Sequence, residues 1–167
     1  MSEQKWVAFL MGSDSDLPVL EAGFERMDEL QVRYEARVLS AHRTPAAVHE
    51  YIRDAEARGC TVFVCAAGMA AHLAGAVAAQ TTRPVIGIPV DSGPLQGFDA
   101  LLSTVQMPGG VPVAAVAIGR AGAVNAAFLA AQILAVADAD LAERVMRQRQ
   151  AAAEKVLQKD AALQARS

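Results

Sequence analysis

TVFVCAAGMAAHLAG, residues 61–75, joins a short apolar run to a turn of small residues. The β-branched start, Thr61–Cys65, is typical of a buried parallel strand, and the turn opens into an apolar run that ends near Gln80. His72 is the only strongly polar side chain between Thr61 and Gln80. Because imidazole exchanges protons near neutral pH, His72 is either a proton carrier or a buried histidine bonded to a backbone carbonyl.

Strand and helix patterns alternate along the rest of the chain. Apolar runs predict strands at 6–11, 34–39, 61–65, 84–90 and 113–117, and helical spacing predicts helices at 17–30, 46–58, 71–80, 97–105, 121–137 and 139–163. Such alternation predicts an α/β fold, a parallel sheet with helices on both faces. We expect a single domain over residues 1–167, with a core at about 5–137. Residues 138–163 are expected to form an amphipathic helix that packs on the domain or on a neighbouring subunit.

The composition excludes several classes of protein. The chain has 167 residues, of which 53% are hydrophobic. Its net charge of −3 lacks the excess of positive charge that is typical of nucleic-acid-binding proteins. Cys60 and Cys65 have neither a metal-binding spacing nor a disulfide framework, so we expect a cytoplasmic protein. The polar start, residues 1–6, does not resemble a signal peptide. Residues 60–82 contain no Asp, Glu, Lys or Arg and are long enough to span a bilayer. However, a β-branched strand pattern is followed by a Gly/Ala turn that contains His72, which is typical of a buried strand and a packed helix rather than of a membrane span.

Three turns follow three successive strands, at residues 12–16, 40–45 and 66–75, and ligands of open parallel sheets bind at the carboxyl ends of the strands. In the first turn, Ser13 and the free amides of a helix N-terminus suit a phosphate. Asp14 and Asp16 would repel it if both pointed inward, so we expect one carboxylate to accept hydrogen bonds from a ribose. The alternative is that this turn only caps the helix.

The second turn places His42 beside Arg43, and guanidinium is a natural bidentate partner of phosphate or carboxylate. The alternative is a surface ion pair for Arg43 and a solvated His42. In the third turn, Gly68 lets the chain approach a ligand closely. His49 is expected on a solvated helix face.

Together the three turns predict a small, anionic, nucleotide-like ligand. The sequence contains no Cys/His metal set, no Walker loop and no GxGxxG turn, so we expect proton transfer on the ligand without a metal or redox cofactor.

Four motifs in order carry a family resemblance: GSDSD at 12–16, SAHRTP at 40–45, AAHL at 70–73 and QMPGGVPV at 106–113. Together they resemble the PurE family, the N5-carboxyaminoimidazole ribonucleotide mutases of purine biosynthesis, and Arg43 with the last motif resembles its bacterial class. The resemblance implies a flavodoxin-like three-layer sandwich, a homo-octamer, and no metal or organic cofactor. It also implies that the substrate loses CO2 from its 5-amino nitrogen and is recarboxylated at C4.

The resemblance also implies residue roles. The position that matches His72 is the general acid/base, and His42 lines the site near the base of the nucleotide. The remaining positions implied in substrate binding are Ser13, Ser40 and Arg43 for phosphate, Asp16 for ribose, the backbone of Ala67, Gly68 and Ala71 around the base and carboxylate, and Ala41.

Two residues depart from the family pattern, which usually has Gly at Met69 and Pro at Ala74. If the backbone of residue 69 has a positive φ, Met69 is strained, and its side chain could enter the carboxylate pocket. Two alternative functions stay open: a direct aminoimidazole ribonucleotide carboxylase, which usually has Lys at the Arg43 position, and a non-catalytic nucleotide-binding module.

Overall fold

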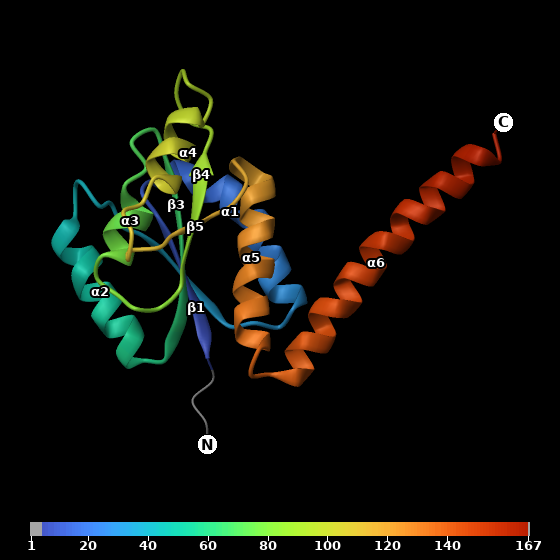
Figure 1. Ribbon diagram of the computed structural model, residues 1–167, viewed down its shortest axis with the longest axis horizontal. Coiled ribbons are helices and arrows are strands. Elements are labelled where there is room, and N and C mark those ends of the chain that lie inside the picture. Colours follow the sequence, from blue (N-terminus) through green and yellow to red (C-terminus); the bar gives the residue numbers. More distant parts are fainter. Residues whose placement is uncertain (1–4, 167) are drawn as a thin grey trace.

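A parallel sheet organises the computed structural model, which describes residues 5–166 (Figure 1). Within these residues, five strands lie in the order β2-β1-β3-β4-β5, and every neighbouring pair is parallel. The strands are β1 (Trp6–Met11), β2 (Tyr34–Val38), β3 (Cys60–Gly68), β4 (Val85–Val90) and β5 (Ala114–Ala115). The predicted α/β class with a parallel sheet is confirmed.

Helices cover both faces of the sheet, which gives three layers (Figure 1). They are the short 3-10 turn η1 (Asp14–Asp16), α1 (Leu17–Glu29), α2 (Pro45–Ala57), α3 (Leu73–Ala78), α4 (Phe98–Val105), α5 (Gly119–Ala135) and α6 (Ala139–Gln164). Buried residues of α1 and α5 share one core cluster, and buried residues of α2 and α3 share the other.

Strand β1 contributes side chains to both clusters of buried residues, one on each face of the sheet. Its alternate residues Val7, Phe9 and Met11 belong to the cluster under α1 and α5, whereas Trp6 and Leu10 belong to the cluster under α2 and α3. Successive side chains of a strand point to opposite faces, so a strand buried on both faces is apolar without interruption.

The element boundaries differ from expectation where small residues dominate. Strand β3 continues to Gly68, three residues beyond its predicted end, because the backbone of residues 66–68 pairs with residues 88–90 of β4. Helix α3 therefore begins later than predicted, at Leu73. Strand β5 is only two residues long instead of five.

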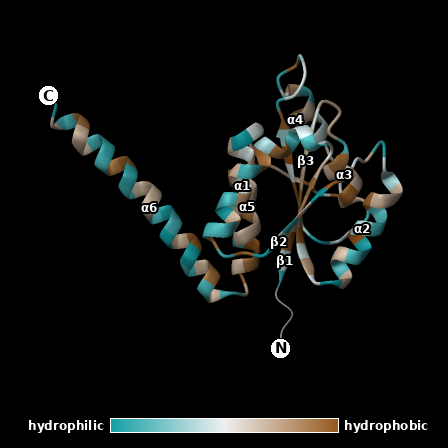
Figure 2. Ribbon diagram, turned by 180° about the vertical axis from the view of Figure 1, so that it is seen from behind, coloured by the Kyte–Doolittle hydropathy of each residue, from teal (hydrophilic) through white to brown (hydrophobic). Residues whose placement is uncertain are grey.

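Helix α6 leaves the body of the molecule and extends into open space (Figure 1). Only Leu141 and Val145 on it are buried, and the Arg144 Nε donates to the Leu30 carbonyl oxygen at 2.9 Å. Apolar residues continue beyond this anchor: Val156 and Leu157 are about two-thirds exposed, and brown segments recur along the helix in Figure 2. The expected packing on the domain thus holds only for the first part of α6. None of the helices within residues 5–166 combines the length and apolarity that crossing a bilayer requires.

Candidate active site

The three predicted turns meet at the carboxyl ends of β1, β2 and β3. There they surround a pocket of about 410 Å³. Residues that line it are Gly12, Ser13, Ser15, Asp16, Ser40, Ala41, His42, Arg43, Ala67, Gly68, Met69, Ala70, His72, Leu73 and Ser92. Every residue expected in the site is among them except Ala71. The side chain of Ala71 is buried, at 2% exposure, and the contribution expected from its backbone stays a prediction.

A larger cavity, of about 740 Å³, lies elsewhere and contains no residue of the three turns. It is lined by residues near the start of α6, such as Asp138 and Arg144, and by Lys5 and Arg33, which precede β1 and β2. It therefore adjoins the amino ends of the strands. Since ligands of open parallel sheets bind at the carboxyl ends, the smaller pocket is the candidate site.

Two histidines from different turns contact each other in the pocket. His42 Nε2 lies 2.8 Å from His72 Nδ1, and the ring centroids are 4.9 Å apart with the planes 83° to each other. Both residues are exposed, so the reading of His72 as a buried structural histidine is wrong. The hydrogen bond uses one nitrogen of each ring, and each ring keeps a second nitrogen with which it can give or take a proton.

Arg43 joins the second turn to the first. Its Nη2 donates to the Gly12 carbonyl oxygen at 2.8 Å, and its backbone N–H donates to the Ser40 Oγ at 3.1 Å. These partners are uncharged, in place of the surface ion pair considered from sequence. A guanidinium has five N–H donors, so Arg43 can hold this position and still bind an anion.

The Thr44 side chain supports the same turn rather than capping α2. Its hydroxyl donates to the Ser40 carbonyl oxygen at 3.1 Å and accepts the Ser40 N–H at 3.0 Å. The turn that presents His42 and Arg43 is therefore closed by its own side chains.

The first turn separates the two carboxylates. Asp16 lines the pocket and is only 5% exposed, whereas Asp14 is exposed and lies outside the pocket lining. Burial raises the pKa of the Asp16 carboxyl, the nearby Asp14 raises it further, and hydrogen bonds from the Ser13 backbone and the Ser15 side chain oppose the rise. Ser13 also caps the turn, since its Oγ accepts from the Ser15 N–H at 3.3 Å.

Ser92 is a pocket residue that sequence reasoning missed. It follows the end of β4, and its Oγ lies so close to Gly68 that a Cβ on that glycine would be 1.7 Å away. Position 68 therefore has no room for a side chain. The rule that located the other three turns, applied to the end of a fourth strand, would have found Ser92.

Met69 has a positive φ, of 55°, as considered from sequence. A non-glycine residue in this left-handed region costs roughly 1 kcal/mol or more. Its side chain is 56% exposed at the pocket and points toward Gly93, where a Cβ would lie 3.4 Å from the Met69 Cγ. The second departure, Ala74, is buried in α3 at 3% exposure, outside the pocket lining.

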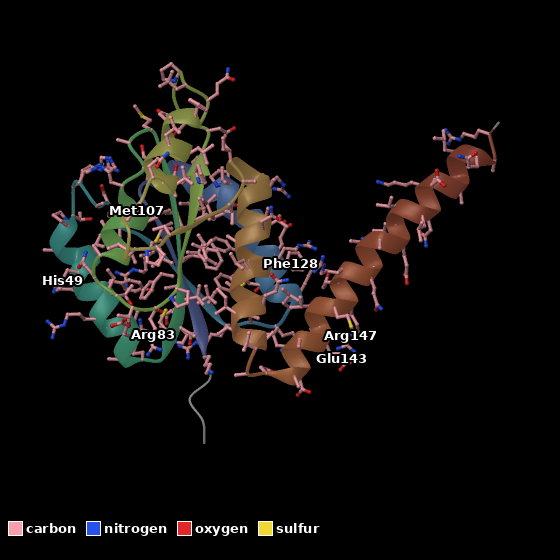
Figure 3. All side chains as sticks on the ribbon, in the orientation of Figure 1. His49, Arg83, Met107, Phe128, Glu143 and Arg147 are labelled. Carbon is pink, nitrogen blue, oxygen red and sulfur yellow. The ribbon has the colours of Figure 1, made fainter. Side chains whose placement is uncertain are left out.

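His49 is exposed on α2, as expected (Figure 3), and does not line the pocket. Its Nδ1 is 2.6 Å from the Gln80 Oε1, which ties α2 to the segment after α3. Cys60 and Cys65 are buried free thiols. Residues 5–166 hold no cluster of three or more His, Cys, Asp or Glu side chains arranged to bind a metal ion.

The chain is similar to proteins of known family over most of its length. Residues 6–155 match the family model described as AIR carboxylase. The N5-carboxyaminoimidazole ribonucleotide mutase of Bacillus subtilis is 52% identical over 155 residues, which cover 93% of this chain and 96% of that protein. The mutase of the same name from Mycobacterium tuberculosis is 49% identical over 162 residues, which cover 97% of this chain and 92% of that protein.

Solved structures agree with the fold. The crystal structure of Treponema denticola PurE superposes with a TM-score of 0.86 at 30% identity, and the match covers 95% of this chain and 98% of that one. Because the family model and the half-identical relatives both span nearly the whole sequence, this chain belongs to the AIR carboxylase family.

Proposed function

We propose that this protein is an isomerase of de novo purine biosynthesis. It converts N5-carboxyaminoimidazole ribonucleotide to 4-carboxy-5-aminoimidazole ribonucleotide. The observation that carries the proposal is the hydrogen-bonded pair of His42 and His72, in one pocket with Arg43. The name shared by relatives that are half identical to the chain gives the substrate.

The turns divide the work of substrate binding. Ser13, Ser40 and Arg43 hold the phosphate, because a guanidinium and hydroxyls at the helix N-terminus complement its charge. Asp16 accepts hydrogen bonds from the ribose. Its burial favours a ligand whose hydroxyls replace the water that the carboxylate has lost.

We expect Ala41, Ala67 and Gly68, which also line the pocket, to contribute to substrate binding, with Ala67 and Gly68 around the base and its carboxylate. Their small side chains leave the space that a planar ring requires.

The reaction needs one proton delivered and one removed. The N–CO2 bond breaks, its electron pair stays on the 5-amino nitrogen, and the histidine pair gives that nitrogen a proton. C4 of the ring then attacks the CO2 held in the pocket, and the C4 proton returns to the pair, which restores its starting state. One imidazole can serve both steps because imidazole both donates and accepts a proton. The pocket keeps CO2 beside C4, so recarboxylation becomes effectively unimolecular.

The test compares two substrates under identical conditions: N5-carboxyaminoimidazole ribonucleotide alone, and aminoimidazole ribonucleotide with bicarbonate. We expect turnover of the first far above that of the second. Preference for the second would make the protein a direct carboxylase. Absence of turnover with both, together with nucleotide binding, would make it a non-catalytic module.

We further propose a cytoplasmic homo-octamer in which each chain forms one domain. The exposed apolar residues on the outer part of α6 support burial against other subunits, as does Val136, which follows α5 and is 89% exposed. Sedimentation equilibrium tests the assembly, since an octamer has eight times the 17.5 kDa mass of the chain. A monomeric mass at micromolar concentration would contradict it.

A further inference from the structure

We propose that Ser92 is a specificity-determining residue whose hydroxyl donates a hydrogen bond to the carboxylate of the substrate and of the product. This inference rests on the proposed isomerase function, because that function supplies a ligand with a carboxylate at its base as well as a phosphate. Ser92 follows β4, so it adds a fourth strand end to the pocket that the three turns surround.

The hydroxyl of Ser92 is free to bind a ligand, in contrast to the other serines of the pocket. The Ser15 Oγ donates to the Ser13 Oγ at 2.9 Å, and the Ser40 Oγ accepts from the Arg43 backbone N–H at 3.1 Å. Within the described part of the chain the Ser92 Oγ makes no hydrogen bond, although this serine lines the pocket and is only partly exposed. Such a hydroxyl has a hydrogen bond left for a ligand to accept.

The same hydroxyl occupies the space that a side chain at position 68 would fill. A Cβ on Gly68 would lie 1.7 Å from the Ser92 Oγ and 3.3 Å from the Val90 carbonyl oxygen. Gly68 therefore leaves room for the hydroxyl, and the two residues line the pocket side by side. Because we expect Gly68 around the base and its carboxylate, the Ser92 hydroxyl lies in the part of the pocket where the carboxylate binds.

Close packing fixes the backbone that carries Ser92. The preceding residue, Asp91, lies against two glycines: a Cβ on Gly97 would be 3.1 Å from the Asp91 Cα, and a Cβ on Gly119 would be 3.2 Å from the Asp91 Oδ1. Gly97 precedes α4 and Gly119 begins α5, so two helices hold the chain just beyond the end of β4. A donor on a backbone that is already fixed loses little conformational freedom when it binds a ligand.

A hydroxyl suits both positions of the carboxylate. It donates to a charged oxygen, which gives a stronger hydrogen bond than a neutral acceptor does. It also turns about its C–O bond, so it can donate to the carboxylate on the 5-amino nitrogen in the substrate and on C4 in the product. Ser92 transfers no proton and changes no bond.

The test compares two nucleotides that differ only in the carboxylate: 4-carboxy-5-aminoimidazole ribonucleotide and aminoimidazole ribonucleotide. Calorimetry in bicarbonate-free buffer gives the affinity of each, and repetition in the His72→Asn background limits turnover during the measurement. A hydrogen bond to a charged group contributes roughly 10-fold to 150-fold in affinity. Ser92→Ala should therefore bind the carboxylated nucleotide about tenfold or more weakly than wild type, and the other nucleotide with nearly unchanged affinity.

Ser103→Ala is the matched control for the loss of a hydroxyl. The Ser103 Oγ donates to the Asp99 carbonyl oxygen at 2.7 Å on α4, and this serine does not line the pocket. We expect this variant to bind both nucleotides as wild type does.

The outcomes separate this inference from the proposed function. If wild-type protein fails to convert N5-carboxyaminoimidazole ribonucleotide, the proposed function fails and this inference fails with it. If wild type converts it and Ser92→Ala weakens the binding of both nucleotides alike, or of neither, only the inference is overturned; an equal loss would mean that Ser92 merely supports the turn at Gly68. If Ser92→Ala does not fold, Ser92→Gly, which also lacks the hydroxyl, decides by the same comparison. Circular dichroism establishes which variants are folded.

Discussion

His42 Nε2 and His72 Nδ1 lie 2.8 Å apart although 30 positions separate the two residues in sequence. A hydrogen bond at this distance holds one proton between the rings, and that proton belongs to one ring or the other. When the outer nitrogen of one ring gains or loses a proton, the shared proton can shift to compensate. The pair therefore works as one unit, and a substitution at either position disturbs both.

Asparagine at either histidine is expected to abolish most turnover while leaving nucleotide binding nearly unchanged. Loss of a general acid/base typically costs between about 100-fold and 10,000-fold in kcat. Because the two rings act together, the double variant should be little slower than the slower single variant. Stopped-flow or coupled assays give kcat, and calorimetry gives the affinity. A near-wild-type rate for His72→Asn would exclude His72 from the reaction and leave His42 as the only proton carrier.

Arg43→Ala should weaken nucleotide binding and leave nucleoside binding unchanged. A hydrogen bond to a charged group contributes about 1.5–3 kcal/mol, which corresponds to roughly 10-fold to 150-fold in affinity. Arg37→Ala is the matched control: this arginine lies over the Tyr51 ring at 5.1 Å and does not line the pocket. Calorimetry with nucleotide and nucleoside distinguishes the two variants. Equal affinity of wild-type protein for both ligands would contradict the phosphate role.

The parts of the site set by topology were predictable from sequence. A continuous apolar run such as Trp6–Met11 indicates a strand buried on both faces, and parallel strands bring their carboxyl ends to one edge. The turns that contain Ser13, His42 and His72 could therefore be placed together before any coordinates were known.

Distances and side-chain directions were not predictable, since they depend on strand register and on packing between turns. No sequence pattern indicates that His42 contacts His72, and only the family resemblance distinguishes Asp16 from Asp14. The inward packing of Ala71 is similarly local, because it depends on where β3 ends and α3 begins. Ser92 was missed for a different reason: its loop has no motif, although the strand-end rule points to the end of β4 as well.

Gly68→Ala should destabilise the protein, and Ser92→Gly should restore much of the loss. A Cβ on Gly68 would lie 1.7 Å from the Ser92 Oγ and 3.0 Å from its Cβ, so the Ser92 side chain must move, and glycine at position 92 removes both atoms. Overpacking of this kind costs about 1–3 kcal/mol. Urea unfolding of the four proteins of a double-mutant cycle measures the coupling. Additive effects of the two substitutions would show that the close contact does not limit residue 68.

Asp16 is expected to lower stability at neutral pH because its folded-state pKa is raised, chiefly by burial. For an acid with this sign of shift, the folded protein binds more protons than the unfolded chain between the two pKa values. The free energy of unfolding therefore falls as the pH rises through that interval. The ribose-binding role that we propose explains why the site keeps a carboxylate that lowers the free energy of unfolding at neutral pH.

Asp16→Asn should therefore be at least as stable as wild type at neutral pH, with an advantage that shrinks on acidification. Urea unfolding from about pH 3 to about pH 7 measures the difference in free energy of unfolding, which should grow with pH and then level off. Glu21→Gln, at an exposed residue of α1 that does not line the pocket, removes the same formal charge and is the matched control. The same variant should bind the nucleotide more weakly, since an amide replaces the acceptor for the ribose hydroxyls. The opposite result would be a stability of Asp16→Asn that falls further below wild type as the pH rises. It would mean that hydrogen bonds to the carboxylate outweigh its burial, so that the folded state lowers the pKa of Asp16.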